Sequence, residues 1–261
     1  MPIQRTQHDS VAVLALELGR SNAINQGFID ALNGALDTLD QDPAVRGLVI
    51  TGQGRAFCVG LDLMEATALD QPALERFVDA FDALFERVAR FPWPVVAAVN
   101  GHAIAGGCLL AMAADYRVMA QGPYQIGVNE VALGIPLPSA SFEVARRGIP
   151  AAAWPEALFQ GRLYRTEEAL AAGLVQKVAE QDVLAEAIAV AARLAGGAPE
   201  ALKTMKADVI APMVASVAAH REARRERFIA CWNTPEARAR IGRVRDQLAR
   251  KASGPKEGAT G

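Results

Sequence analysis

Three short apolar segments alternate with helical patterns, and each of them runs into a loop that contains glycine. These segments are residues 11–18, 47–51 and 95–99. A continuous apolar run is typical of a strand buried on both faces, as the strands of a parallel sheet are. Between the segments, residues 25–40 and 72–90 repeat apolar side chains every three or four positions, which is typical of amphipathic helices. The chain is therefore expected to belong to the α/β class.

The rest of the chain changes from mixed to helical patterns. A wholly apolar helix is expected at residues 106–114 and another strand at 116–120, and helical patterns dominate after Pro138. We therefore predict a core domain over residues 1–198 and a C-terminal α-helical region over residues 199–261.

The helical region has a mixed composition. Residues 220–251 combine many Arg and Glu with Phe228, Ile229, Trp232, Ile241, Val244 and Leu248. Such a mixture is typical of a packing helix, and also of a contact between subunits, so self-association is expected. Residues 251–261 are expected to fray.

Charge and composition exclude several classes of function. The 261 residues carry 27 Lys and Arg against 29 Asp and Glu, a formal net charge of −2, which argues against a nucleic-acid partner. The chain has no apolar run of about 18 residues and no apolar segment at its start, so we expect no membrane partner and a cytoplasmic location. The three Cys and three His are widely spaced, which predicts neither disulfides nor a metal site.

Two glycine-containing loops carry the most specific pattern of the sequence. Residues 54–63 read GRAFCVGLDL, and residues 100–112 read NGHAIAGGCLLAM. Neither loop completes a dinucleotide or P-loop motif. Together and in this order, they closely resemble the paired signature of the crotonase superfamily, the enoyl-CoA hydratase/isomerase family. The resemblance continues to residues 171–175 and so covers most of the chain.

This resemblance implies a fold, an assembly and a substrate class. The implied fold is the crotonase (ClpP/crotonase-like) spiral of ββα units with a C-terminal helical trimerisation region. The implied assembly is a homotrimer or a dimer of trimers. The implied substrate is an acyl-CoA thioester, and no separate cofactor is expected because CoA is part of the substrate.

The resemblance also implies an oxyanion hole made of main-chain N–H groups. The matching positions are Leu61 and Gly106, whose N–H groups would donate to the thioester oxygen. Removal of the proton next to a thioester needs the charge arriving on that oxygen to be stabilised, and main-chain donors are suited to this. Gly106 also begins the expected apolar helix, whose N-terminus favours an anion. The structural alternative is that these glycines only allow close packing of helix and strand.

One carboxyl group is expected to carry the acid–base chemistry. Hydratases of the family use two glutamates, and the position of one of them is Leu109 here, which cannot activate water. The other is matched by Glu130, which lies in a mostly apolar stretch where desolvation should raise its pKa. The alternative is that Glu130 is a structural carboxylate that caps a helix or pairs with Arg.

Further positions match the CoA-binding loops of the family. By resemblance, the residues expected to contact the coenzyme or the acyl group are Arg20, Ala23, Arg55, Cys58, Val59, Gly60, Asp62 and Asn129. We also read Cys58 and Cys108 as small packing residues. Residues 64–91 are expected to line the acyl tunnel.

The sequence therefore predicts an enoyl-CoA delta isomerase of fatty acid β-oxidation, more similar to the 3,2-trans-enoyl-CoA isomerases than to the hydratases. Glu130 would move a proton between two carbons, with no water required. A hydratase, another acyl-CoA lyase or a thioesterase of the same family is the first alternative. A non-catalytic CoA-binding assembly protein is an alternative of a different class.

Overall fold

Two sheets form the centre of the molecule, and from β3 to β8 consecutive strands of the chain alternate between them. The computed structural model describes residues 3–19 and 21–253. The larger sheet has the order β1-β2-β3-β5-β7-β10, and the smaller one β4-β6-β8-β9. The larger sheet consists of β1 (Ile3–His8), β2 (Val11–Leu16), β3 (Gly47–Gly52), β5 (Val95–Val99), β7 (Tyr116–Ala120) and β10 (Lys177–Ala179). The smaller consists of β4 (Ala56–Cys58), β6 (His102–Ile104), β8 (Gln125–Gly127) and β9 (Tyr164–Arg165).

Along the chain, one unit is repeated in which two strands are followed by one or more helices. β3 leads into β4, β5 into β6 and β7 into β8, and each pair is followed by helices. Neighbouring strands are parallel except for the pairs β1–β2 and β8–β9. The helices are α1 (Gln26–Asp40), α2 (Leu63–Ala66), α3 (Gln71–Ala89), α4 (Gly106–Ala113), α5 (Glu130–Leu133), α6 (Ser139–Gly148), α7 (Thr166–Ala171), α8 (Val183–Leu194), α9 (Pro199–Trp232) and α10 (Pro235–Ser253). This arrangement confirms the predicted α/β spiral of ββα units.

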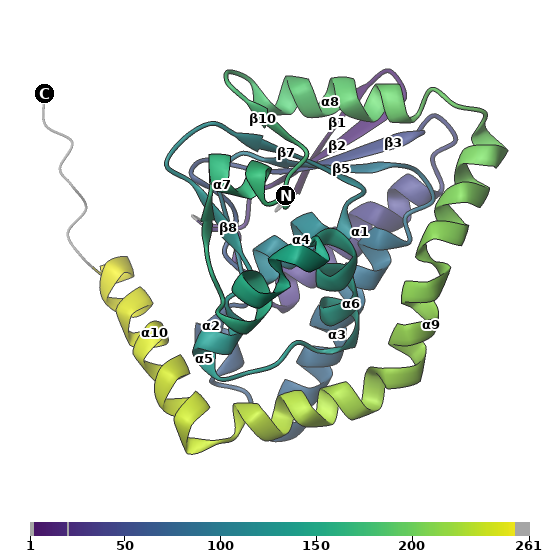
Figure 1. Ribbon diagram of the computed structural model, residues 1–261. Helices are drawn as coiled ribbons and strands as arrows, with labels where there is room; N and C mark the ends of the chain where they lie inside the picture. Colours follow the sequence, from purple (N-terminus) through teal and green to yellow (C-terminus); the bar gives the residue numbers. More distant parts are fainter. Residues whose placement is uncertain (1–2, 20, 254–261) are drawn as a thin grey trace, which may run out of the picture.

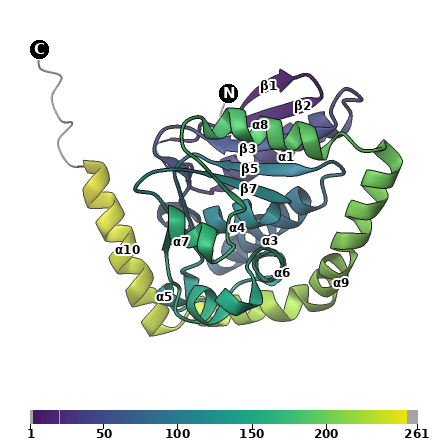
Figure 2. The same ribbon diagram turned by 45° about the horizontal axis from the view of Figure 1, so that its top comes forward.

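Helices cover both faces of the larger sheet. Val11 and Val13 of β2 pack with Val190 of α8 on one face, while Leu14 packs toward the main core, which includes Leu32 of α1. Figures 1 and 2 show α8 on one side of this sheet and α1, α3 and α4 on the other. Burial on both faces explains why these strands are uninterrupted apolar runs in the sequence.

The long helices begin where their capping residues predict. The side chain of Asn25 accepts a hydrogen bond from Phe28 N (2.9 Å), and that of Asp70 accepts one from Ala73 N (2.9 Å). Each bond satisfies an N–H group that lacks a partner within its helix. The seven apolar residues whose spacing indicates the second of these helices are all buried: Leu74, Phe77, Val78, Phe81, Leu84, Phe85 and Val88.

A buried carboxylate joins α3 to the start of α6. Asp82 is 3% exposed and accepts hydrogen bonds from Ala140 N (2.8 Å), Ser141 N (2.7 Å) and Ser141 Oγ (2.8 Å). Since α6 has no capping side chain of its own, Asp82 takes that role from another helix. The loop from α5 into α6, which borders the cavity described below, is thereby fixed to α3.

The C-terminal helices wrap around the core. α9 contains Pro212, and Figures 1 and 2 show it descending along one side and then turning beneath the molecule toward α10. A proline inside a helix removes a hydrogen bond and produces such a bend. α9 begins at Pro199, and the division into domains 1–198 and 199–261 stays a prediction.

Several apolar residues of the C-terminal region are buried within their own chain, whereas the sequence also suggested a contact with another subunit. Trp232 is fully buried, and Phe228, Ile229 and Ile241 are at most 7% exposed. They therefore give no support to the predicted subunit contact, and self-association stays a prediction. Fraying was expected over residues 251–261, but residues 251–253 still belong to α10, so the prediction is wrong there; residues 254–261 lie outside the described residues. Within residues 3–19 and 21–253, no helix is long and apolar enough to cross a membrane.

Candidate active site

A cavity of ≈ 600 Å³ opens between the two glycine-containing loops, α5 and the C-terminal helices. Seven of the predicted site residues line it, namely Ala23, Val59, Leu61, Asp62, Gly106, Asn129 and Glu130. Arg55, Cys58 and Gly60 are not part of the lining, and Arg20 lies outside the described residues. The structure thus brings the predicted oxyanion donors and the predicted acid–base residue to one place.

The N–H group of Leu61 is free because of how its strand segment pairs. Ile24 donates to Gly60 O (2.7 Å) and accepts from Asp62 N (2.9 Å), so this short parallel bridge uses the residues on either side of Leu61. In the part of the chain that the structure describes, Leu61 N and Gly106 N have no hydrogen-bond acceptor. Gly106 is the first residue of α4, where the helix provides no partner for an N–H group. Both donors are therefore available to a ligand in the cavity.

The backbone at the start of α4 is held in a conformation that side chains rarely adopt. Ala105 has φ 53° and ψ −123°, although it is not glycine. Such strain persists only where the surroundings fix it, and it is concentrated at functional sites. Ala105 N donates to Gly127 O (2.8 Å) and thereby ties the turn to β8.

The two loops touch at glycines that have no room for a side chain. A Cβ atom on Gly60 would lie 2.8 Å from Gly106 N, and a Cβ on Gly107 would lie 1.9 Å from Cys58 O. Cys58 itself is fully buried behind the lining, and burial raises the pKa of its thiol to about 12. These contacts explain why small residues occupy both loops and support the packing interpretation of Cys58.

Substitution of Gly107 by alanine is expected to lower the free energy of unfolding by about 3 kcal/mol, because the new methyl group overlaps backbone atoms that cannot move independently. Urea unfolding followed by circular dichroism measures this loss. Gly34→Ala is the matched control: Gly34 lies inside α1 with nothing within 4 Å of its added Cβ, so it should gain about 0.5 to 1 kcal/mol. Equal stability of the two variants would contradict the close approach of the loops.

Glu130 presents to the cavity a carboxyl group with one unpaired oxygen. The residue is 8% exposed, and its Oε2 atom has no hydrogen-bond partner among the described residues. Burial raises the pKa of Glu130 to about 7, although the main-chain N–H groups of Glu130 and Asn129 act against this. The predicted upward pKa shift is therefore confirmed. A carboxyl with a pKa near neutrality can both take and return a proton.

Among the residues that the structure describes, no second acid stands opposite Glu130. Leu109 is fully buried and lines the cavity at the position where hydratases have their other glutamate. Asp62 is the other acid in the lining, and its carboxylate accepts hydrogen bonds from Met64 N (3.0 Å) and Glu65 N (3.3 Å) at the start of α2. The Asp62 carboxylate therefore serves as a helix cap, and the contact of the Asp62 main chain with the coenzyme stays a prediction.

Part of the cavity lining comes from residues that were not predicted to belong to the site. Met64, Val78 and Phe81 line the cavity as expected for the tunnel region, but Phe228 of α9 and Val244 and Leu248 of α10 do so as well. These last three residues have an amphipathic helical spacing in the sequence, but that spacing does not indicate which surface they contact. These three residues line the cavity because the chain turns back toward it through the end of α9 and along α10.

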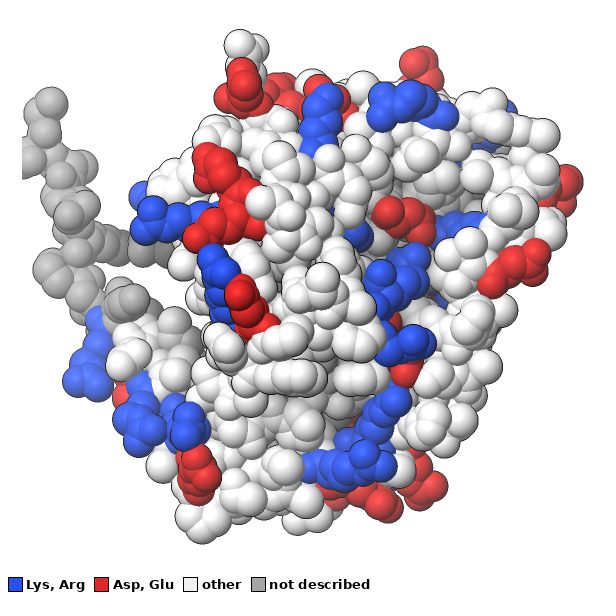
Figure 3. Space-filling model, viewed as in Figure 1, with Lys and Arg blue, Asp and Glu red and all other residues white. Residues whose placement is uncertain are grey.

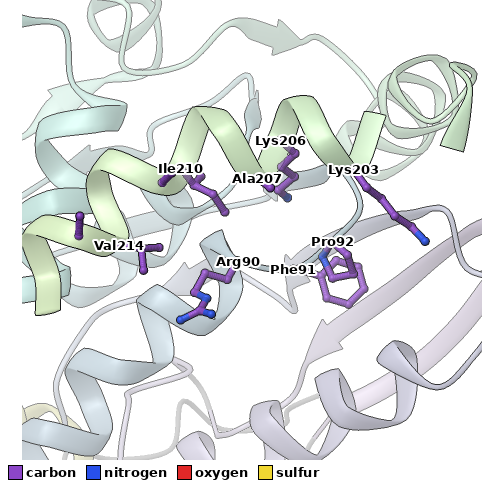
Figure 4. A pocket seen from close by; sticks show the side chains of 10 residues that line it. Arg90, Phe91, Pro92, Lys203, Lys206, Ala207, Ile210 and Val214 are labelled. Atoms are coloured by element: carbon purple, nitrogen blue, oxygen red, sulfur yellow. The ribbon is translucent and has the colours of Figure 1, made fainter. Parts of the chain in front are cut away.

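A second hollow of ≈ 570 Å³ lies between the end of α3 and α9. Figure 4 shows Arg90, Phe91 and Pro92 on one side and the α9 residues from Lys203 to Val214 on the other. Lys206 is held there by Trp93 O (2.6 Å) and Asp115 (2.6 Å). No carboxyl group lines this hollow, which makes it a poor candidate for acid–base catalysis. The described residues contain no group of three or more His, Cys, Asp or Glu that could hold a metal ion.

Known proteins share both the sequence pattern and the fold. A family model described as enoyl-CoA hydratase/isomerase matches residues 6–244. A Thermus thermophilus protein provisionally named an enoyl-CoA hydratase is 38% identical over 191 residues, which cover 72% of this chain and 75% of that protein. The mitochondrial enoyl-CoA delta isomerase 1 of Rattus norvegicus is 31% identical over 182 residues, or 69% of this chain and 63% of that protein.

A solved structure extends the similarity to nearly the whole chain. The human mitochondrial delta3-delta2-enoyl-CoA isomerase superposes with a TM-score of 0.90 at 25% identity, covering 97% of this chain and 100% of that one. The molecule thus has the crotonase fold, with α9 and α10 as its C-terminal helical region. The chain belongs to the enoyl-CoA hydratase/isomerase family, whose members are enzymes that act on acyl-CoA substrates.

Proposed function

We propose that this enzyme is an enoyl-CoA delta isomerase, which moves a double bond from C3 to C2 of an enoyl-CoA thioester. Glu130 is the acid–base group, and the N–H groups of Leu61 and Gly106 form the oxyanion hole. The observation that carries the proposal is the single carboxyl of Glu130, with one unpaired oxygen, in a cavity where Leu109 replaces a second acid.

The reaction needs only one proton carrier. The Glu130 carboxylate takes a proton from C2, and the electrons of the C2–H bond move into the thioester to form a dienolate. Leu61 N–H and Gly106 N–H donate to the charged oxygen, and each such donor is worth about 3 kcal/mol in the transition state. The protonated Glu130 then gives the proton to C4, and the double bond becomes C2=C3. Water and a separate cofactor take no part in these steps.

Binding of the coenzyme is attributed to the cavity mouth. Ala23, Val59 and the main chain around Asp62 border it, and Asn129 Oδ1 is buried without a partner among the described residues. Figure 3 shows Lys and Arg gathered on α10, which carries Arg238, Arg240, Arg243, Arg245 and Arg250 against Glu236 and Asp246. A basic helix beside the mouth favours a ligand with several phosphate charges. Roles for Arg20 and Arg55 in phosphate binding stay predictions.

Hydration is the second candidate, because a relative at 38% identity is provisionally named a hydratase. Hydration would need a group to hold and activate water opposite Glu130, and the fully buried Leu109 cannot do so. Chromatographic separation of the two enoyl isomers, followed by mass spectrometry of each product from 3-enoyl-CoA and from 2-enoyl-CoA, distinguishes the two functions. The proposal requires an isomer of unchanged mass from the first substrate. A 3-hydroxyacyl product from the second, without isomerisation of the first, would favour the hydratase.

The pH dependence follows from the ionisation of Glu130. Because the base must be ionised and its pKa is raised to about 7, kcat/KM should fall about tenfold for each pH unit below 7 and level off above it. Initial rates on 3-enoyl-CoA between pH 5.5 and 9 measure this profile, with the affinity for a saturated acyl-CoA as control. A rate that stays constant from pH 5.5 to 8 would contradict the assignment of Glu130 as the base.

A non-catalytic CoA-binding protein is the remaining alternative. It would bind a CoA thioester without converting any enoyl isomer. A buried carboxyl with an unpaired oxygen costs folding free energy, which a binding scaffold without chemistry has no reason to keep. The proposed assembly as a homotrimer or a dimer of trimers, the cytoplasmic location and the place in β-oxidation stay predictions.

A further inference from the structure

The segment that carries the Leu61 N–H group is held by a short stretch of chain that precedes α1. Three main-chain hydrogen bonds join residues 59–62 to residues 21–24: Val59 N to Ser21 O (3.1 Å), Ile24 N to Gly60 O (2.7 Å) and Asp62 N to Ile24 O (2.9 Å). These bonds lie on either side of Leu61 N and so fix the direction of its N–H group. Because a donor stabilises an oxyanion only when it points to the place where the charge develops, the position of residues 21–24 matters to the reaction.

Asn22 lies within this stretch and has an unusual conformation. It is 1% exposed, and its φ of 49° falls in the left-handed region, which asparagine adopts more readily than most residues other than glycine. Capping of α1 does not account for its presence, since Asn25 provides that cap through its hydrogen bond with Phe28 N. A buried amide side chain in this conformation therefore has another role.

The side chain of Asn22 ties residues 21–24 to the edge of the smaller sheet. Its Oδ1 atom accepts a hydrogen bond from Leu18 N (2.8 Å). Its Nδ2 group donates to Phe57 O (3.1 Å) and, at 3.4 Å, to Ala56 O. Both carbonyls belong to β4, the first strand in the order of that sheet, and main-chain groups on an edge need partners other than a neighbouring strand. Asn22 thus bonds β4 where the strand continues into residues 59–62.

We propose that Asn22 is a positioning residue of the oxyanion hole: it fixes residues 21–24 to β4, and these residues hold the Leu61 N–H group toward the cavity. This inference rests on the proposed function, because it takes the Leu61 N–H group as a donor to the thioester oxygen. Asn22 does not belong to the cavity lining, although Ser21 and Ala23 on either side of it do. It therefore acts through Leu61 and not on the substrate.

Loss of the Asn22 side chain should misalign one of the two oxyanion donors. Buried main-chain groups on both sides of it lose their partners, so residues 21–24 are no longer fixed to β4 and the segment 59–62 can shift with them. A misplacement of about 1 Å at a reacting group can cost about 100-fold in rate. Gly106 N keeps its place, because the turn before it is tied separately to β8.

The test compares two variants that leave the left-handed conformation accessible. Asn22→Gly removes both sets of side-chain hydrogen bonds, and glycine adopts a positive φ without steric cost. Asn22→Asp keeps an acceptor for Leu18 N and removes only the donor to β4. Both variants should lower kcat for 3-enoyl-CoA by about 10- to 100-fold, while the Kd of butanoyl-CoA changes by no more than about threefold.

The polarisation of a bound thioester reports the alignment of the donors directly. Infrared difference spectroscopy of butanoyl-CoA, labelled with carbon-13 at the thioester carbonyl, measures the carbonyl stretching frequency without any chemical conversion. In the wild type, two N–H donors should lower this frequency below its value in water, and Asn22→Gly should lose about half of that shift. A loss of stability alone does not change the frequency of a ligand bound to folded molecules.

Asp9→Gly is the matched control. Asp9 also has a positive φ, of 50°, but it is exposed between β1 and β2 and does not line the cavity. This variant should keep the wild-type kcat and carbonyl frequency.

The outcomes separate the positioning role from the proposed function. A wild-type carbonyl frequency in Asn22→Gly overturns the inference, whatever the change in kcat or Kd. A wild-type enzyme that leaves the carbonyl frequency at its value in water overturns both the inference and the oxyanion hole. If the frequency depends on Asn22 but the wild type forms no isomer from 3-enoyl-CoA, the proposed function is rejected and the positioning role stands.

Discussion

Replacing Glu130 with glutamine is expected to lower kcat for 3-enoyl-CoA isomerisation by about 1,000-fold. Glutamine keeps the shape of the side chain but can neither accept the C2 proton nor deliver one to C4. The oxyanion donors are main-chain groups, so the Kd of a saturated acyl-CoA should change by no more than about threefold. Stopped assays with product analysis and a separate binding titration measure the two quantities.

Glu180→Gln is the control for this substitution, because Glu180 is exposed and remote from the cavity lining. It should retain the wild-type kcat. If Glu130→Gln keeps more than about a tenth of the wild-type kcat, Glu130 is not the proton carrier.

The same variant has a pH-dependent effect on stability. The pKa of Glu130 is raised in the folded state, so its contribution to stability is fully present below about pH 4.5 and is lost as the pH rises through about 7. The difference between the ordinary value of 4.5 and about 7 corresponds to about 3 kcal/mol. Between pH 5 and pH 8 the stability of Glu130→Gln relative to the wild type should therefore rise by about this amount. Urea unfolding at the two pH values measures the difference in the free energy of unfolding between the variant and the wild type. If this difference is the same at both pH values, the Glu130 carboxyl group is well solvated or paired.

Replacing Asp82 with alanine is expected to lower the free energy of unfolding by about 3 to 5 kcal/mol. Three buried donors, Ala140 N, Ser141 N and Ser141 Oγ, lose their acceptor together. The start of α6 and the loop before it also lose their attachment to α3. Because Leu137 and Pro138 in that loop line the cavity, activity should fall along with stability.

Two further variants separate the hydrogen bonds from the charge. Asp82→Asn keeps one acceptor oxygen and should cost about 1 to 2 kcal/mol less than alanine. Asp79→Ala, three residues earlier on α3, removes only a half-exposed ion pair with Arg225 and should cost less than about 1 kcal/mol. Chemical denaturation of the three variants gives the comparison. Similar losses for Asp79→Ala and Asp82→Ala would contradict the capping role.

The helices and strands that could be predicted from the sequence are those whose apolar residues repeat at a regular interval or form one continuous buried run. α3 shows seven apolar residues at helical spacing, and β3 and β5 are fully apolar apart from one threonine and glycines. β4, β6 and β8 were missed because three residues are too few to show any period. β1 was missed because five of its six residues are exposed, as suits an antiparallel strand at the edge of the sheet.

The part of the candidate site that could be predicted is the part where close contact between backbones allows only small residues. Gly60 and Gly107 leave no space for a side chain, so the two loops keep a pattern that can be recognised. The part of the cavity lining that comes from α10 was not predictable in the same way. Val244 and Leu248 would show the same spacing if they packed on another subunit, and only the bend of α9 brings them to the cavity.

Transfer of the C2 proton to C4 by one carboxyl group can be followed directly with a 3-enoyl-CoA that carries deuterium at C2. Glu130 is buried, and the other acid in the described lining, Asp62, is bound to the start of α2, so part of the deuterium should appear at C4 of the 2-enoyl-CoA product before it exchanges with solvent. Mass and NMR analysis of the product after a single turnover in ordinary water measures this fraction. Deuterium at C4 in the wild type is the result we expect. A product whose C4 carries only protium from the solvent would contradict transfer by a single carboxyl group that is shielded from water.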